Sequence, residues 1–219
     1  MATKAALAEA ARELGRRDRR LRMVIARVGP PALRRPRPRR EHFAALARAI
    51  CYQQLAGAAA SAIHGRFSGL YDGLPTADAV LATPEARLRA CGLSASKTAS
   101  IRDLAEKVLD GTVELDRLGR LDDATVVAEL VRVRGIGEWT AHMFLISQLG
   151  RLDVWPTGDL GVRNGFAAIH GLDPVPSARE LGPMADGYRP FRSLVAWYCW
   201  RVVDVEAPVN GRRPPRRAR

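Results

Sequence analysis

Hydrophobic residues recur at helical spacing along almost the whole chain. The pattern is clearest over 94–111, where Ser94 is a favourable N-cap and Gly111 can end a helix. One apolar stripe lies between them, formed by Ile101, Leu104, Ala105 and Val108. The same spacing predicts helices over 41–51, 57–69, 77–82, 85–91, 122–132, 138–149 and 159–169. The best strand candidate, GTVELDRL, alternates only weakly, so the pattern predicts an all-α protein with short loops.

Two more helices are indicated by the residues at their starts. Ser177 and Glu180 have the spacing of a capping box, in which each side chain bonds to the backbone N–H of the other residue. Pro190 suits the first turn of a last helix. The inner face of that helix would carry Leu194, Trp197, Tyr198 and Arg201. We expect Trp197 and Trp200 to belong to the core.

The chain divides into three parts by composition. Residues 1–40 form a basic segment that we expect to be partly helical and packed with the core. Residues 41–206 form the main helical body, and residues 207–219 form a basic tail that we expect to be disordered. No run of about 18 apolar residues is present, and the N-terminus lacks the apolar block of a signal peptide. The prediction is therefore a cytoplasmic protein that does not associate with membranes.

The three cysteines lie far apart and show no CxxC or metal-ligand spacing. Their number also excludes an iron–sulfur cluster held by four cysteines. The formal net charge of +12 favours a polyanionic partner such as nucleic acid. Ten arginines, however, lie in two stretches without acids, RRPRPRR and GRRPPRRAR, so the rest of the chain carries only about +2. A near-neutral globule with solvated basic segments is the alternative.

The segment 123–149 contains two predicted helices joined by the turn VRGIG. Gly135 and Gly137 permit backbone angles that other residues resist, and without side chains they let another backbone approach closely. Ile136 between them would pin the turn to the core. The turn leads into a helix N-terminus, where free N–H groups and the helix dipole favour an anion. This predicts a helix-hairpin-helix that binds DNA phosphates without reading sequence. Its contacts would come from Gly135, Ile136, Gly137 and Thr140; an ordinary turn between helices is the alternative.

Asp159 stands in the stretch WPTGDLGVR, 22 positions after Gly137 and at the predicted start of a helix. An aspartate there is a common N-cap. The same carboxylate can also act on a bound substrate, and the two roles do not exclude each other.

Five stretches in the same order resemble the helix-hairpin-helix, Gly/Pro-rich loop, aspartate (HhH-GPD) superfamily of DNA glycosylases. They are AICYQQLAGAAASAI, CGLSASKTASIRDLA, VRGIGEWTAHM, WPTGDLGVR and YRPFRSLVAWYCWR. The resemblance covers roughly residues 18–203 and is strongest to the alkylpurine branch, the 3-methyladenine DNA glycosylase II type. It implies two helical subdomains that flank a DNA-binding cleft. Arg134 stands where the family often has proline, and Phe191 where tryptophan is frequent.

The resemblance implies a monofunctional enzyme. In bifunctional members a lysine directly after the hairpin attacks the sugar, and here that position corresponds to Trp139. The chain has no lysine beyond residue 107, so a Schiff base at this site is not available and water is the expected nucleophile. Asp159 would stabilise the positive charge that develops on the sugar and orient or deprotonate water. Glu138, the other nearby acid, is expected to interact with the helix dipole.

Base excision requires the base to leave the duplex, and a side chain must fill the gap. The loop between two predicted helices offers Gln53, Gln54 and Leu55, and the resemblance favours Gln54 as the wedge. The alternative is a polar loop in which a glutamine caps a helix. A cationic base would stack on an electron-rich ring. The expected pocket consists of Trp139, Phe191 and Trp155, with Met143 one turn beyond Trp139 on the same helix face.

The resemblance also implies that the hairpin can bind one Na⁺ or K⁺ through the carbonyls of Val131, Val133 and Ile136; no other cofactor is expected. Three basic residues could contact phosphates or pair with acids, namely Lys97, Arg163 and Arg192. The histidines at 64, 142 and 170 show no ligand spacing and are expected to be structural or exposed.

The predicted function is release of 3-methyladenine or 7-methylguanine from double-stranded DNA, without strand nicking, by a monomeric enzyme that starts base excision repair. The enzyme is expected in the bacterial cytoplasm, associated with the nucleoid. A second carboxylic acid is less necessary when the leaving base already carries a positive charge. A glycosylase for another damaged base and a non-catalytic damage-binding protein are the alternatives. Asp159 argues against the latter, because holding phosphates needs no acid beside DNA.

Overall fold

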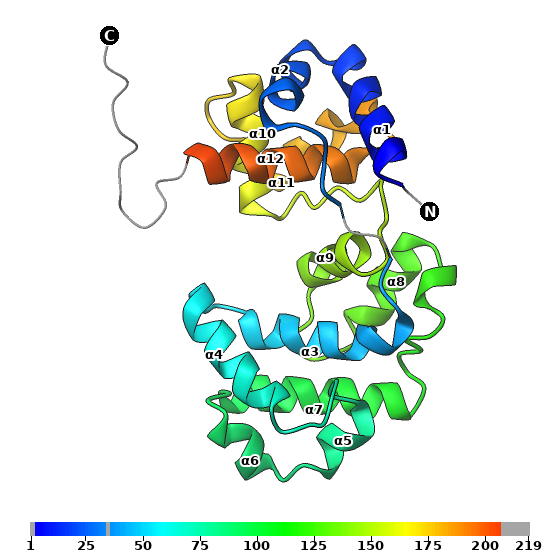
Figure 1. Cartoon of the computed structure of the whole chain (residues 1–219), viewed down its shortest axis with the longest axis vertical. Helices are drawn as coiled ribbons and strands as arrows, with labels where there is room; N and C mark the ends of the chain where they lie inside the picture. The colour runs from blue at the N-terminus through cyan, green and yellow to red at the C-terminus, as the bar shows by residue number, and fades with distance from the viewer. Residues whose placement is uncertain (1–2, 34–35, 207–219) are drawn as a thin grey trace. The chain divides into compact units, whose positions relative to one another are not determined.

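The computed structural model describes residues 3–33 and 36–206 (Figure 1). Every regular element in these ranges is a helix, which confirms the predicted all-α class. The chain forms two compact units. Among the described residues, unit 1 combines residues 3–33 with residues 150–206, and unit 2 comprises residues 36–149. The predicted tail, 207–219, lies outside the described residues.

Unit 1 is built around the packing of α12 on α10, with α2 against both helices (Figure 1). Its helices are α1 (Lys4–Arg17), α2 (Arg19–Val28), α10 (Leu160–His170), α11 (Ala178–Met184), the 3-10 helix η3 (Asp186–Tyr188) and α12 (Arg192–Glu206). Leu14 and Leu21 from the N-terminal helices are buried in one core with Leu194 and Tyr198 of α12. The N-terminal segment is therefore part of the unit that contains Asp159.

One glycine sets how closely α10 and α12 approach. A Cβ built at Gly165 would lie 2.2 Å from the backbone carbonyl oxygen of Cys199, far inside van der Waals contact. Because that neighbour is backbone rather than the tip of a side chain, it cannot move aside without moving α12. The close crossing therefore depends on glycine at this position.

A polar cluster ties the N-terminal helices to the rest of unit 1. Asp18 caps α2 by accepting the N–H groups of Arg20 and Leu21, and its other oxygen accepts the Tyr188 hydroxyl at 2.5 Å. Burial opposes ionisation of Asp18, yet these hydrogen bonds hold its pKa below the ordinary value. His170 lies 3.3 Å from the Tyr188 hydroxyl and packs on Phe166, so it has a structural role as expected.

Unit 2 is organised around α7, which packs against α3, α5 and α6 (Figure 1). Its elements are the 3-10 helix η1 (Arg39–Glu41), α3 (His42–Tyr52), α4 (Gly57–Ser68), α5 (Ala77–Ala82), α6 (Glu85–Ala90), α7 (Ala95–Leu109), the 3-10 helix η2 (Leu118–Arg120), α8 (Asp123–Leu130) and α9 (Glu138–Ser147). The pair α8–α9 forms the predicted hairpin, and α9 also packs against α3.

The helices predicted by range end within two residues of the observed ones. The predicted caps are present as well: Ser94 accepts the Lys97 N–H, and Ser177 and Glu180 form a capping box. Pro190 is an exception, because α12 begins only at Arg192. The Phe191 N–H donates to the Tyr188 carbonyl and continues the turn of η3, so Pro190 precedes the helix instead of occupying its first turn.

Within the described ranges, no helix combines the length and apolarity needed to cross a bilayer. The three cysteines are buried and unpaired. In the same ranges, no group of three or more His, Cys, Asp or Glu side chains is arranged to hold a metal ion.

Candidate active site

The two glycines of the hairpin turn have different roles. Gly135 has φ +77°, in the left-handed region that favours glycine, and a Cβ there would lie 2.7 Å from Ser100 Oγ on α7. Gly137 has φ −98°, which any residue adopts, and a Cβ there would meet no atom of the protein. This corrects the prediction that both glycines serve the backbone angles. Gly137 leaves open space at the start of α9, in agreement with the prediction that a missing side chain lets another backbone approach.

The contrast gives a stability prediction for Gly135. Gly135→Ala places a side chain at a strained φ and against Ser100, so we expect the free energy of unfolding to fall by about 1–2 kcal/mol. Thermal unfolding followed by circular dichroism measures the loss. An unchanged midpoint would show that the turn tolerates the left-handed angle without glycine.

The turn is held from two sides. Asp103 Oδ2 on α7 accepts the Arg134 N–H at 2.7 Å, and Gln53 Nε2 donates to the Gly135 carbonyl at 2.8 Å. Ile136 is only 4% exposed, so its side chain anchors the turn in the core as predicted. Burial alone would raise the pKa of Asp103, but the Lys107 ammonium and the Arg134 N–H lower it. A proline at 134 would remove the N–H that Asp103 binds.

The loop between α3 and α4 contains the candidate wedge. Gln54 has φ +55°, a conformation that costs a non-glycine residue of order 1–3 kcal/mol and is often found at functional sites. The side chains of Gln54 and Leu55 are exposed, whereas Gln53 is engaged with Gly135. The first residue before α4 is Ala56, which makes no side-chain cap bond, so a glutamine does not cap this helix. Gln54 and Leu55 remain the wedge candidates. The hydrogen bond from Gln53 to Gly135 indicates that Gln53 instead supports the hairpin turn.

Unit 2 contains a cavity of about 820 Å³ that brings most of the predicted hairpin and wedge residues together. Its wall includes Gln53, Gln54, Gly135, Gly137, Trp139, Thr140 and Met143. Trp139 is 47% exposed, which suits a surface for stacking. Thr140 is only 5% exposed, so its side chain is part of the wall, and an anion there would meet the backbone N–H groups of the first turn of α9.

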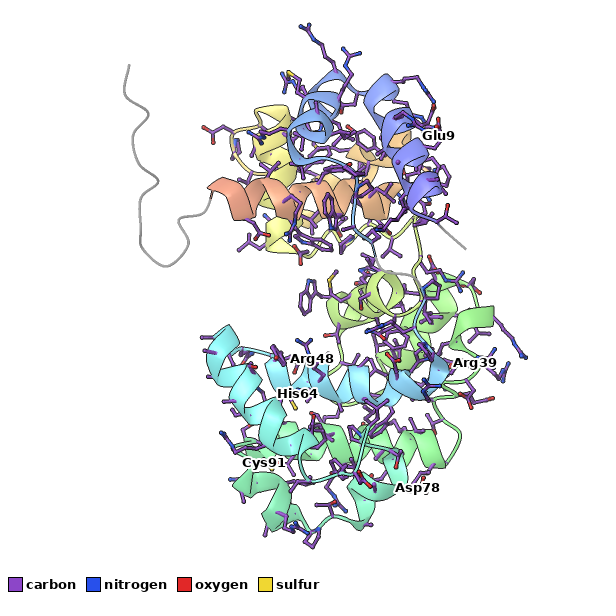
Figure 2. All side chains as sticks on the ribbon, in the orientation of Figure 1. Glu9, Arg39, Arg48, His64, Asp78 and Cys91 are labelled. Carbon is purple, nitrogen blue, oxygen red and sulfur yellow. The ribbon has the colours of Figure 1, made fainter. Side chains whose placement is uncertain are left out.

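Two basic residues, Arg48 and Lys97, line this cavity. Arg48 on α3, labelled in Figure 2, places its guanidinium 4.0 Å from the centre of the Tyr52 ring, and sequence analysis did not single it out. The sequence feature that could have identified Arg48 is that it is the one arginine in the mostly apolar helix HFAALARAICY. Lys97 Nζ donates to the Cys51 carbonyl at 2.8 Å, which resolves its role: it holds the end of α3.

The predicted cation ligands are all present in the hairpin turn. The Val133 carbonyl accepts the Ile136 N–H at 3.0 Å, and a carbonyl oxygen has a second lone pair that can bind a cation. Val131, at the end of α8, and Ile136 would supply the other two carbonyls. The chemistry of these donors fits Na⁺ or K⁺, and the ion stays a prediction.

In unit 1, Asp159 is the N-cap of α10, as its position predicted. Its Oδ1 accepts the Val162 N–H at 2.8 Å. The same oxygen accepts the indole N–H of Trp200 on α12 at 3.0 Å. Trp200 packs against the core of unit 1, in line with its prediction, but it is only partly buried and its indole N–H also contacts the candidate catalytic carboxylate. No local sequence signal shows this contact, because 41 residues separate the two positions.

The two aromatic candidates of unit 1 differ in burial. Phe191 is partly buried before the start of α12 and stays a candidate. Trp155 is 7% exposed, packs edge-on against Phe166 and donates its indole N–H to the Leu181 carbonyl at 3.0 Å. We therefore assign Trp155 to the core, which corrects its prediction as a pocket residue. An indole this enclosed offers no face to a base.

Of the two arginines whose roles were left open, Arg192 pairs with an acid, whereas Arg163 binds a backbone carbonyl. Arg192 donates Nε and Nη2 to the two carboxylate oxygens of Asp153 at 2.8 and 3.0 Å. Burial would raise the pKa of Asp153, but Arg192 and Arg189 lower it, so the carboxylate stays ionised. Arg163 donates to the Pro176 carbonyl at 2.8 Å. Arg163 thus links α10 to a neighbouring loop, and Arg192 does the same for α12.

The fold and these residues define a base excision repair protein. Residues 47–182 match the family model described as "HhH-GPD superfamily base excision DNA repair protein", and the chain belongs to this superfamily. The resemblance inferred from the five stretches is thereby confirmed.

The relatives specify the branch. The DNA-3-methyladenine glycosylase 1 of Schizosaccharomyces pombe is 32% identical over 202 residues, which cover 90% of this chain and 89% of the relative. A solved structure of the 3-methyladenine DNA glycosylase of that organism, in complex with abasic DNA, has a TM-score of 0.81 and 32% identity, and covers 90% of this chain and 97% of that chain. A DNA-3-methyladenine glycosidase from Bacillus halodurans has a TM-score of 0.79 and 30% identity, with 88% of each chain covered.

Proposed function

We propose that this protein is a monofunctional DNA glycosylase that hydrolyses the N-glycosidic bond of alkylated purines in double-stranded DNA and so starts base excision repair. The observation that carries the proposal is Asp159, a half-buried carboxylate held by two N–H donors at the start of α10. Similarity to relatives that are named 3-methyladenine DNA glycosylases supports the substrate class.

The chemistry requires a negative charge beside the sugar. As the bond to the base breaks, the sugar becomes oxocarbenium-like, and a fixed carboxylate stabilises that positive charge. The carboxylate of Asp159 can also orient and deprotonate the attacking water. A purine alkylated at N3 or N7 leaves as a neutral base, so one acid suffices.

A covalent mechanism lacks its nucleophile. The residue after Glu138 at the start of α9 is Trp139, and the chain has no lysine beyond residue 107. Without an amine at the hairpin, no Schiff base forms with the abasic sugar, and the strand is left intact after base release.

In the proposed function, unit 2 supplies the surface that binds DNA. The start of α9 offers N–H groups to a phosphate, and Gly137 leaves them uncovered. The exposed ring of Trp139 offers a stacking surface to a cationic base. Met143, which lines the same cavity, adds a polarisable side chain that adapts to the shape of the base.

Gly137 gives a direct test of the phosphate contact. In Gly137→Ala a methyl group stands in front of the first turn of α9 without touching the rest of the protein, so we expect the Kd for duplex DNA to rise about 10-fold while thermal stability is unchanged. Fluorescence anisotropy with a labelled duplex measures the Kd. Gly119→Ala is the matched control, because a Cβ at Gly119 also meets open space. Equal affinities of the two variants would contradict phosphate binding at Gly137.

The substrate class is tested with duplexes that each carry a single lesion. Single-turnover rates of base release would be compared for 7-methylguanine and 3-methyladenine, which are cationic, and for hypoxanthine and 8-oxoguanine, which are neutral. For each base, the rate enhancement is the ratio of the enzymatic to the uncatalysed rate of release. We expect this enhancement to be at least about 10-fold larger for the cationic bases than for the neutral ones. Faster release of a neutral lesion would assign another damaged base. Tight duplex binding with no release from any duplex would indicate a damage-binding protein.

A further inference from the structure

The carboxylate of Asp159 is held from two helices. Its own helix, α10, supplies the Val162 N–H at 2.8 Å, as for any capping aspartate. The second donor is the Trp200 indole N–H at 3.0 Å, which comes from α12. Both donors bind the same oxygen, Oδ1, so they restrict rotation of the carboxylate about its side-chain bonds.

The packing of α10 on α12 makes the second contact possible. Gly165 allows the two helices to approach until its Cα faces the backbone of Cys199. One turn earlier, Gly161 leaves space for the indole: a Cβ there would lie 3.0 Å from Trp200 Cδ1 and 3.1 Å from Asp159 Oδ1. Two glycines on one face of α10 thus bring the indole against the carboxylate.

We propose that Trp200 is a positioning residue for Asp159, whose indole N–H fixes the orientation of the carboxylate. The inference rests on the proposed function, in which Asp159 faces the reacting sugar. A carboxylate that is already held in one orientation can face the positive charge that develops on the sugar without first reorienting. Phenylalanine lacks both the N–H and one ring of the indole, so a matched Trp→Phe substitution on the same helix is needed to control for the lost volume.

The test compares Trp200→Phe with Trp197→Phe in the full-length protein. Trp197 lies on the same helix, where its ring packs edge-on against Tyr198 and lies 5.6 Å from the Arg201 guanidinium. We expect Trp200→Phe to lower the single-turnover rate of methylpurine release about 10-fold, with an unchanged Kd for DNA. Trp197→Phe should match the wild type in both measurements.

A second measurement does not depend on activity. The side-chain N–H signal of Trp200 is identified in ¹H–¹⁵N spectra as the indole peak that Trp200→Phe lacks. We expect this peak to lie at a different ¹H position in Asp159→Asn than in the wild type, because a neutral amide oxygen is a weaker acceptor than a carboxylate. An indole peak at the same position in both proteins would overturn the contact with Asp159.

The outcomes separate the two proposals. If the wild type releases methylpurine and Trp200→Phe does so at the same rate, the positioning role is wrong and the glycosylase proposal stands. If the wild type releases no base, the proposed function fails, and the position of the indole peak still decides whether Trp200 binds the Asp159 carboxylate.

Discussion

Asp159→Asn is expected to lower the rate of methylpurine release by about 10³-fold or more while leaving the fold intact. The amide has nearly the shape of the carboxylate but carries no charge, so it neither stabilises the developing cation on the sugar nor deprotonates water. Asparagine is as good an N-cap as aspartate, so the Val162 N–H keeps an acceptor and α10 keeps its start. Single-turnover assays on a 7-methylguanine duplex measure the loss.

Asp122→Asn is the matched control for this substitution. Asp122 caps α8 by accepting the Thr125 N–H at 2.9 Å, as Asp159 caps α10. If the capping role of Asp159 were the whole of its function, the two variants would show the same small effects. We expect Asp122→Asn to keep the wild-type rate. Full activity of Asp159→Asn would mean that another group carries the reaction.

Gly165→Ala is expected to lower the free energy of unfolding by about 3 kcal/mol and the midpoint of thermal unfolding by about 10 °C. The new methyl group would lie 2.2 Å from the Cys199 carbonyl oxygen, and relief requires α10 and α12 to separate. Separation opens the core of unit 1, where Val162 and Phe166 pack near Tyr198. Differential scanning calorimetry measures both quantities.

Gly65→Ala is the matched control for the effect of adding a methyl group to a helix. Gly65 lies within α4, and a Cβ there would meet open space. Because alanine favours helix over glycine, we expect this variant to be as stable as the wild type or more stable by up to about 1 kcal/mol. If Gly165→Ala proved as stable as Gly65→Ala, α10 and α12 would not pack as closely as described.

Much of the fold could be predicted because its signals are local. Helix ends follow from caps such as Ser94 and Ser177, whose partners lie three residues away, and helical faces follow from apolar spacing. The same holds for part of the site. Asp159 stands at a helix start and Ile136 lies between two glycines, so both positions were recognisable from their neighbours.

Contacts between distant segments could not be predicted. Trp200 and Asp159 are 41 residues apart, and Gln53 and Gly135 are 82 residues apart. Apolar spacing marks Trp200 only as a residue on the inner face of a helix, and nothing in it shows which group the indole meets. For the same reason Trp155 could not be told from a pocket residue, since a buried and an exposed tryptophan look alike in sequence.

The role of a glycine also depends on what surrounds it. Gly135 and Gly137 look equivalent in GIG, yet the first is required by a left-handed angle and the second leaves open space. Likewise, the grouping of the N-terminal helices with α10 and α12 depends on tertiary packing, which joins segments separated by more than a hundred residues. Sequence composition instead separated residues 1–40 from the rest.

The central claim is best tested by incubating the wild-type protein with a methylated duplex and analysing one reaction in two ways. Chromatography detects free methylpurine, and a denaturing gel without alkaline treatment reports strand integrity. Our account predicts free 3-methyladenine or 7-methylguanine and an intact strand that breaks only after alkali. Free base together with a nicked strand would contradict the monofunctional mechanism, and the absence of free base would contradict glycosylase activity on alkylated purines.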